Sequence, residues 1–301
     1  MIGYTYTITN KAGDSFKIND HVTDPENFIA LQQYPDMDID VKNNEVNLDG
    51  QHGIWDFFSY FGKRNLSFNG VIIGEDEEAV ETLRNQIVSV LALPMQPSGD
   101  DDGYCTIEWT DATGAEWQIE AKIARSPRFG REMRQNYKLD FMLSFKTDNP
   151  FILSSSSTEE EGTRGYFAYG VKFPIELPAV MGLVAMEAMN VVNDGTVYAH
   201  TVIRLYGEEG GDITNPTITN NTTGKSFRIE TVLADETEYI EIDSQSGTVV
   251  DKDGNDLSAD ISDDSEFVLL KPGNNELVYT ADEAARTPAG AFGVVFKSTK
   301  I

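Results

Sequence analysis

Hydrophobic and polar residues alternate with a period of two along much of the first half of the chain. The alternation is clean over residues 105–109, 117–123 and 137–145. Successive side chains of a strand point to opposite faces of a sheet, so this pattern predicts strands with one buried face. Residues 111–114, with the sequence DATG, separate the first two segments, and Gly114 can adopt a positive φ without steric cost. The sequence therefore predicts a hairpin there.

A helical spacing replaces this alternation between residues 77 and 91. Apolar side chains at positions 80, 83, 87, 90 and 91 fall on one face of an α-helix. Acidic residues at 76–78 favour a helix N-terminus, and Pro94 ends the pattern. We predict one amphipathic helix from about Glu77 to Leu91, entered from a strand over residues 66–73.

The chain changes character after residue 150. Residues 154–162 read SSSSTEEEG, a polar and acidic stretch that cannot bury a core. A chain of 301 residues exceeds the usual size of one domain. We predict an N-terminal domain over residues 1–152, a linker over 153–176 and a C-terminal domain over 177–301.

The second half consists of short apolar runs between turn residues, without a second helical pattern. Many short strands joined by Gly, Asn and Asp turns are typical of a β-sandwich or jelly roll. The predicted fold class is mainly β, with an N-terminal β-barrel or sandwich that carries one helix and a C-terminal β-sandwich. Strands are predicted within Leu177–Val192 and at Val202–Tyr206, Phe227–Ile229, Tyr239–Ile242, Phe267–Leu270, Leu277–Tyr279 and Phe292–Phe296.

Acidic residues outnumber basic residues by 50 to 23, which gives a formal net charge of −27. Residues 1–150 carry 25 acidic and 13 basic side chains and residues 151–301 carry 25 and 10, so neither half is a basic module. Recognition of nucleic-acid phosphates depends on clustered Lys and Arg, and the composition argues against it. We expect a solvated, self-repelling surface or, in a second interpretation, a channel wall that repels DNA.

Nothing in the sequence predicts export or membrane insertion. No stretch approaches the roughly 18 consecutive apolar residues of a membrane span, and the start MIGYTYTITNKAGD lacks the regions of a signal peptide. We therefore expect the chain to be made and kept in the cytoplasm until another component exports it or lyses the cell.

Cys105 is the only cysteine, which excludes an internal disulfide and favours a buried strand position.

The sequence predicts no catalytic, cofactor or metal site. None of the three histidines has a metal-ligand spacing, and no G-x-S-x-G elbow marks a serine nucleophile. Residues 224–226, GKS, lack the first glycine of a phosphate loop and favour a hairpin turn. Asp251–Asp256 has the carboxylate density of a calcium loop, but its glycine and last ligand are misplaced, so a turn is favoured over an ion site. Two glycosylation-like sequons, at Asn220 and Asn221, are interpreted as turn residues.

Four arginines are gathered between two predicted strands. Arg125, Arg128, Arg131 and Arg134 follow one another at three-residue spacing, with Gly130 among them. Basic residues in one connection of an acidic protein can meet acid on a neighbouring subunit, can be merely solvated, or can face DNA. We favour the subunit contact, so the four arginines are candidates for an oligomer interface.

The order of several short motifs resembles that of a known family. Residues 63–70, KRNLSFNG, form a basic strand entry before the helix, and the first half ends with DNPF at 148–151. The second half contributes three more motifs to this order: NDGT at 193–196, NPTITN at 215–220 and LKPGNN at 270–275. Together they resemble the distal tail proteins of siphophages, the Dit family, over nearly the whole chain.

The resemblance implies a virion structural protein of the tail tip, made in the host cytoplasm, with no reaction to catalyse and no cofactor. It implies a homo-hexameric ring in which tail-tube-like N-terminal domains surround a DNA-conducting channel and galectin-like C-terminal sandwiches project outward. The implied partners are the major tail tube protein and the tail hub or tail-associated lysin, with receptor-binding or side-fibre proteins in some relatives. DNA is only passing cargo, and no membrane is involved.

A carbohydrate-binding module or receptor-binding accessory protein stays open as the alternative. Jelly-roll sandwiches often bind glycans, and aromatic side chains can stack on sugar rings. Several of the aromatic candidates lie in strand-like runs, where core packing is the favoured interpretation. The candidates are Tyr166, Phe167, Tyr169, Tyr206 and Tyr239.

Overall fold

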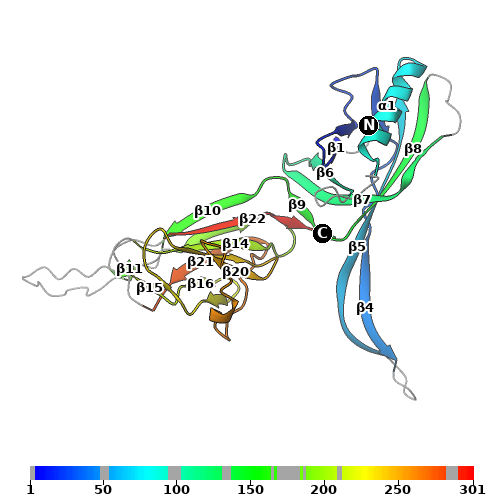
Figure 1. The fold of residues 1–301 in the computed structure, drawn as a ribbon. Coiled ribbons are helices and arrows are strands. Elements are labelled where there is room, and N and C mark those ends of the chain that lie inside the picture. Colours follow the sequence, from blue (N-terminus) through cyan, green and yellow to red (C-terminus); the bar gives the residue numbers. More distant parts are fainter. Residues whose placement is uncertain are drawn as a thin grey trace, which may run out of the picture. The chain divides into compact units, whose positions relative to one another are not determined.

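The computed structural model of the chain describes residues 4–47, 54–93, 103–130, 137–163, 166–167, 184–185, 188–208, 212–282 and 291–301. The chain divides into two compact units, Met1–Ser155 and Ser156–Ile301. Both are built mainly from strands, and the described residues contain one α-helix (Figure 1), as the hydrophobic pattern predicts. Within the described part, no helix is long and apolar enough to cross a membrane.

The first unit is built on one antiparallel sheet. Its strands are β1 (Tyr6–Asn10), β2 (Ser15–Ile18), β3 (Phe28–Leu31), β4 (Ile39–Asn47), β5 (Ile54–Ile73), β6 (Tyr104–Thr110), β7 (Glu116–Phe129), β8 (Lys138–Thr147) and β9 (Ile152–Ser154). They follow the order β2-β1-β6-β7-β8-β5-β3, with β4 added at β5 and β9 at β7. The three alternating segments lie in β6, β7 and β8, and the predicted turn joins β6 to β7 with Gly114 at φ 88°.

One face of this sheet and helix α1 (Glu77–Val90) enclose the core of the first unit. Ile107 and Phe145, which the alternation assigns to the buried face, are at most 1% exposed. Full burial of a large apolar side chain stabilises a fold by roughly 1.5–3 kcal/mol. The helix begins where the Asp76 carboxylate accepts a hydrogen bond from the Ala79 amide at 2.8 Å, so the predicted start is confirmed.

Asn19 joins the two edge strands of the sheet. It is buried at φ 66°, and its backbone amide donates to the Ile29 carbonyl at 2.6 Å. Its side-chain oxygen accepts from the Leu31 amide at 2.8 Å, and its side-chain nitrogen donates to the Tyr4 carbonyl at 3.1 Å. Because β2 and β3 end the strand order, these bonds draw the sheet edges together, which agrees with the predicted barrel or sandwich.

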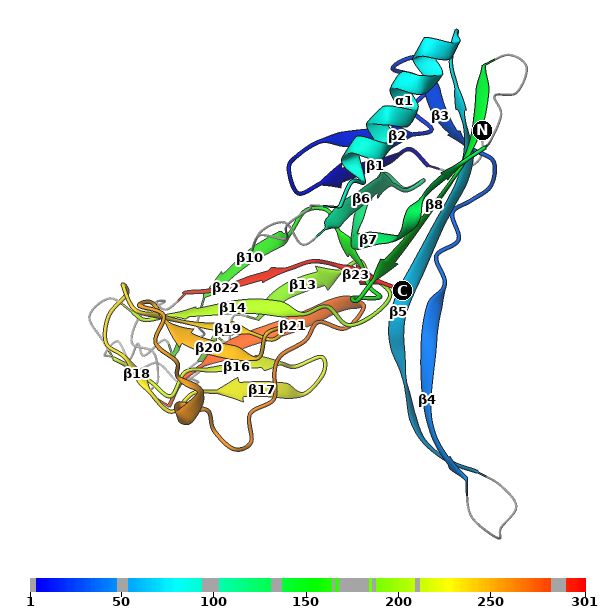
Figure 2. The same ribbon diagram turned by 45° about the vertical axis from the view of Figure 1, so that its right-hand side comes forward.

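The second unit is a sandwich of two antiparallel sheets (Figure 2). Its strands are β10 (Thr158–Thr163), β11 (Tyr166–Phe167), β12 (Val184–Ala185), β13 (Met189–Asn193), β14 (Thr201–Tyr206), β15 (Ile213–Thr214), β16 (Thr217–Asn220), β17 (Lys225–Arg228), β18 (Val232–Leu233), β19 (Tyr239–Asp243), β20 (Thr248–Asp251), β21 (Gly273–Thr280), β22 (Ala291–Phe296) and β23 (Thr299–Lys300), with one 3-10 turn, η1 (Ser258–Asp260). The main sheets have the orders β10-β22-β14-β19-β20 and β13-β21-β16-β17. Ile203, Phe227 and Phe292, all at most 1% exposed, belong to its core.

Two predicted segments differ from the structure. The stretch predicted as a linker contains β10, an edge strand whose Glu160 lies opposite Val294 of β22. An exposed edge strand can be acidic, because charge there hinders pairing with another chain.

Residues 267–270 form only an isolated bridge from Leu270 to Ala199 instead of the predicted strand. Of the segment predicted within Leu177–Val192, the described part forms β12 and most of β13, and the remainder lies outside the described residues.

Buried amide side chains hold a turn of the second unit in place. The fully buried Asn275 accepts from the Lys271 amide at 3.0 Å and donates to the carbonyls of Lys271 and Gly273 at 2.8 and 3.0 Å. The Asn220 side-chain nitrogen donates to the Asn275 oxygen and to the Leu269 carbonyl, both at 3.1 Å. Asn220 also begins the turn between β16 and β17, in agreement with its interpretation as a turn residue: its carbonyl accepts from the Gly224 amide at 2.8 Å and its side-chain oxygen from the Thr222 amide at 3.0 Å.

Replacement of Asn275 tests this network. Asn275→Ala leaves several buried polar groups without partners, at roughly 1–3 kcal/mol for each group, so we expect the free energy of unfolding to fall by about 3 kcal/mol. Urea denaturation of the full chain, followed by circular dichroism, measures the change. Asn274→Ala, at the exposed neighbouring position, is the control and should change stability by less than about 0.5 kcal/mol. Equal losses in the two variants would contradict the network.

Replacement of Gly70 tests the close approach of β3 and β5. A Cβ at this position would lie 2.2 Å from the Ala30 carbonyl oxygen and 2.6 Å from the Phe141 ring. We expect Gly70→Ala to force the strands apart and to lower the free energy of unfolding by about 3 kcal/mol. In the control Gly130→Ala, the nearest atom to the new Cβ is 3.7 Å away, so thermal melting should be unchanged. A stable Gly70→Ala variant would show that this contact is not tight.

Candidate assembly surface

Strand β5 extends beyond the sheet to which it belongs. Among the described residues, β8 pairs with it from Arg64 and β3 from Gly70 onward, whereas Ile54–Phe61 pairs with β4 alone. β4 and this part of β5 form a two-stranded ribbon that projects from the rest of the first unit (Figures 1 and 2). On both outer edges of the ribbon, backbone groups have no ladder partner within the described part of the chain. Such edges are templates for pairing with another chain.

The ribbon exposes apolar side chains on both faces. Phe58 and Tyr60 lie on one face at 66% and 51% exposure, and the Lys42 ammonium is 5.7 Å from the centre of the Tyr60 ring. Val41 and Phe61 lie opposite each other on the other face, at 57% and 42% exposure. A lone two-stranded hairpin is marginally stable in water, and exposed apolar patches mark interaction sites. The ribbon therefore has the properties of an interface.

A buried arginine fixes the base of the ribbon. The Arg64 Nε donates to the Pro150 carbonyl at 2.6 Å and its Nη1 to the Met37 carbonyl at 3.2 Å. Burial lowers the pKa of Arg64, and its Nη2 has no hydrogen-bond partner among the described residues. Phe61 and Phe151 meet edge to face nearby, with ring centres 6.1 Å apart. The two motifs of the first unit that carry the family resemblance thus meet at this base.

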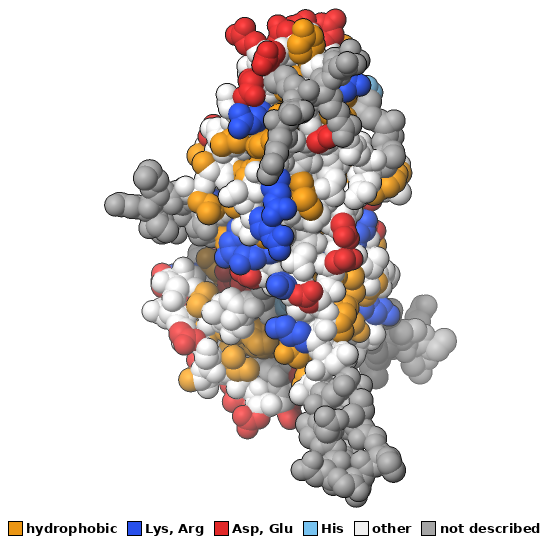
Figure 3. Space-filling model, turned by 90° about the vertical axis from the view of Figure 1, so that its right-hand side faces the viewer, with side chains coloured by type: hydrophobic (Ala, Val, Ile, Leu, Met, Phe, Trp, Pro, Cys, Tyr) orange, Lys and Arg blue, Asp and Glu red, His pale blue; other side chains and the backbone are white. Residues whose placement is uncertain are grey.

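Two of the four candidate arginines lie in strand β7, and not in a connection as the sequence suggested. The pairing of β7 with β8 is irregular on both sides of Arg125. In a regular strand, residues three apart point to opposite faces, but these irregularities leave both Arg125 and Arg128 exposed. Neither forms an ion pair with a described residue. On the face that Figure 3 draws, several Lys and Arg side chains lie together near the middle of the view. Arg131 and Arg134 lie outside the described residues.

The other motifs taken from the sequence form turns. Residues 224–226 follow the bend of the β16–β17 hairpin, in which Gly224 has φ 73°. The Asp251 carboxylate accepts from the Asn255 side-chain nitrogen at 2.8 Å and from the backbone amides of Asn255 and Asp253 at 2.8 and 2.9 Å. The bond from the Asn255 side chain, followed by those from the backbone, lowers the pKa of Asp251. Within the described ranges, no three metal-binding side chains come together.

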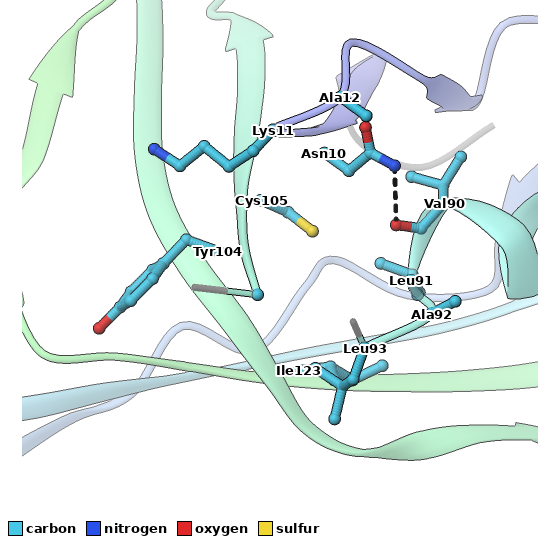
Figure 4. Close-up of a pocket in the computed structure, with 11 residues that line it drawn as sticks. Asn10, Lys11, Ala12, Val90, Leu91, Ala92, Leu93, Tyr104, Cys105 and Ile123 are labelled. Atoms are coloured by element: carbon cyan, nitrogen blue, oxygen red, sulfur yellow. Dashed lines mark hydrogen bonds between the residues drawn. The ribbon is translucent and has the colours of Figure 1, made fainter. Parts of the chain in front are cut away.

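A small cavity lies beside Cys105, between the end of α1 and strand β6 (Figure 4). Its volume is about 40 Å³, and next to it the Asn10 side chain donates to the Val90 carbonyl at 3.4 Å. A cavity holds a water molecule once roughly 10–15 Å³ is open to it, so this space suits water and is small for a substrate. The thiol itself is buried, as predicted from the sequence.

A wider, open hollow of about 360 Å³ lies between β2, β3 and α1. Asp20 and Asp24 line it, but both carboxylates are engaged by their own loop. The hydrogen bond from the Thr23 hydroxyl lowers the pKa of Asp20, and that from the Asn27 amide lowers the pKa of Asp24. The carboxylates of Asp20 and Asp24 are therefore already hydrogen-bonded and are not free to react with a ligand in the hollow.

Comparison with known proteins finds a sequence match in the second unit and a fold likeness over the whole chain. Residues 194–289 match the model of the siphovirus-type tail component, C-terminal domain. The crystal structure of the SPP1 Dit (gp 19.1) protein, named as a paradigm of the hub adsorption apparatus in phages that infect Gram-positive bacteria, is similar over 98% of this chain and 99% of that chain, with a TM-score of 0.62 and 14% identity. A chain of the phage P2 baseplate in its activated conformation with Ca is similar over 98% of both chains, with a TM-score of 0.42 and 12% identity. No curated protein matches the sequence.

The two kinds of similarity agree. The family match covers the segment that contains the Asn220–Asn275 network, and the likeness to SPP1 Dit extends through the ribbon-bearing first unit. Residues 194–289 therefore belong to the family of siphovirus-type tail components, C-terminal domain, and the whole chain has the fold of the SPP1 Dit protein.

Proposed function

We propose that six copies of the chain form a closed ring at the phage tail tip, which connects the tail tube to the hub and adsorption apparatus. The centre of the ring is a channel through which DNA passes. The family match over residues 194–289 and the fold likeness to SPP1 Dit support this setting, and the ribbon of the first unit is the observation that carries the proposal. Its apolar side chains and unpaired edges belong to a surface that another copy covers.

Ring closure explains why the ribbon is left uncovered within one chain. In a head-to-tail arrangement each copy contacts the next one in the same way, and the ring closes when the last copy contacts the first. Every ribbon in a closed ring is then covered by a neighbouring copy. Pairing along an edge adds backbone hydrogen bonds. Full burial of an aromatic side chain such as Phe58 adds roughly 1.5–3 kcal/mol.

The charge distribution supports contacts between copies of the chain. The net charge is −27, whereas Arg125 and Arg128 are exposed on one strand without an acidic partner among the described residues. A basic spot on one copy is attracted to the acidic surface of the next, which also sets the orientation of the contact. The remaining acidic surface suits a channel wall along which the DNA backbone slides without binding.

The proposed role is structural and requires no reaction and no cofactor. In this role the ring binds the major tail tube protein on one side and the tail hub or tail-associated lysin on the other. Receptor-binding or side-fibre proteins attach at the periphery. The protein acts in the virion tail tip after synthesis in the host cytoplasm. These partners follow from the family resemblance and are part of the proposal.

Substitution of the ribbon aromatics tests assembly. Phe58→Ser with Tyr60→Ser removes apolar area that is exposed in the single chain, so the fold should persist while the six-subunit mass is lost. We expect the protein concentration at half-assembly to rise at least tenfold, since about 1.4 kcal/mol corresponds to a factor of ten. Mass photometry of the full chain measures it. Tyr34→Ser, at a tyrosine 64% exposed outside the ribbon, is the control and should assemble normally.

Charge reversal tests the arginine contact. Arg125→Glu with Arg128→Glu is expected to weaken assembly, and added salt should weaken wild-type assembly by screening the same attraction. Light scattering after size exclusion gives the mass at low and high salt. Lys252→Glu, on an exposed turn of the second unit, should leave the mass unchanged. A six-subunit mass in the double variant would exclude the arginine contact, and a monomeric wild type would exclude the ring.

A further inference from the structure

The outer face of the five-stranded sheet in the second unit carries an ordered row of side chains. Strands β10, β22, β14 and β19 lie side by side in this sheet (Figure 2). Their registers place Glu161 opposite Gly293, Gly293 opposite Arg204, and Arg204 opposite Glu241. Residues directly opposite each other point to the same face of a sheet. The four positions therefore form one row that crosses four strands.

Arg204 is held in a fixed orientation at the centre of this row. Its Nε donates to the Glu241 Oε2 at 2.7 Å, and its guanidinium carbon lies 5.6 Å from the centre of the Tyr239 ring. The Arg204 and Glu241 side chains are 46% and 29% exposed, so the pair stays open to solvent. A planar guanidinium oriented in this way presents further N–H donors in a known direction.

Two tyrosines form a shelf beside the row. Tyr206 and Tyr239 lie opposite each other on β14 and β19, with ring centres 5.6 Å apart. Both are half-buried, in contrast to the core packing that the sequence favoured for them. A tyrosine ring combines an apolar surface with a polar tip and loses little conformational entropy when it binds a ligand.

Gly293 leaves an opening in the row. A Cβ at this position would meet no heavy atom within 4 Å, and the backbone does not have the positive φ that favours glycine. Glycine in a strand interior weakens the strand and often marks a place where a ligand approaches closely. Position 293 therefore needs a glycine neither for its backbone conformation nor to avoid a steric clash. What the glycine provides is open space between Arg204 and Glu161.

We propose that this face binds a neutral saccharide, with hydroxyl groups at Arg204, Glu241 and Glu161 and an apolar C–H face on the tyrosine shelf. A hydroxyl group donates and accepts hydrogen bonds, so it can use both members of the preformed Arg204–Glu241 pair. Glu159 and Asp243 lie on the same face of the sheet, and one arginine among these carboxylates leaves the face negative. Anionic glycans and phosphates are therefore disfavoured.

Ligand-observed NMR on the full chain tests the proposal. The probes are the methyl glycosides of galactose, glucose, N-acetylglucosamine, N-acetylgalactosamine and rhamnose, with sialic acid and glycerol phosphate as anionic probes. We expect at least one neutral glycoside to bind with a dissociation constant on the order of 1 mM, as suits a ligand of this size. The anionic probes should not bind. The absence of binding by every neutral glycoside, or binding by the anionic probes alone, would overturn the proposal.

Three variants locate the binding site. Gly293→Val adds bulk at a position where a Cβ meets no heavy atom within 4 Å, and Arg204→Lys keeps the charge but loses the planar fork. Each should weaken binding at least tenfold while the melting temperature is retained. Tyr198→Ala, at a tyrosine 55% exposed elsewhere in the second unit, is the matched control and should bind like the wild type. Wild-type affinity in Gly293→Val and Arg204→Lys would place any sugar elsewhere and refute this site. Binding does not require the ring, so its outcome is separate from the assembly tests.

Discussion

Buried backbone amides and carbonyls must find hydrogen-bond partners, and in this chain the segments that leave the sheets obtain them from a few buried polar side chains. Asn193 donates to the carbonyls of Val197 and Leu270 at 2.8 and 3.0 Å, and Asn275 binds the turn that precedes it. Arg64 does the same for two carbonyls at the base of the ribbon. These bonds hold the turns and the base of the ribbon in place.

The same constraint explains why short and scattered motifs carry the family resemblance. Each of them contains a residue of this kind or its backbone partner: Arg64 and Pro150 in the first unit, Asn193, Asn220 and Asn275 in the second. Their side chains serve the fold, whereas Gly293 lies outside the motifs.

Sequence patterns predicted the elements that have one buried face and missed those that do not. Strands β6 to β8 and helix α1 alternate or repeat because one side of each faces the core. The ribbon has two exposed faces, so it lacks that signal, and the acidic edge strand β10 resembles a linker for the same reason. The irregular pairing that exposes Arg125 depends on β8, and the burial of Asn220 depends on Asn275, 55 residues later in the chain. Such partners are not visible in a local pattern.

The two candidate surfaces differ in what they require of a partner. The ribbon offers backbone edges and apolar rings, which a second copy of the same chain can satisfy by adding strands. The face around Arg204 is already ordered by its own ion pair and tyrosines, so a small ligand can bind there without rearrangement. Each surface belongs to a unit with its own hydrophobic core. Substitutions on the Arg204 face can therefore alter recognition while the registers that support assembly stay intact.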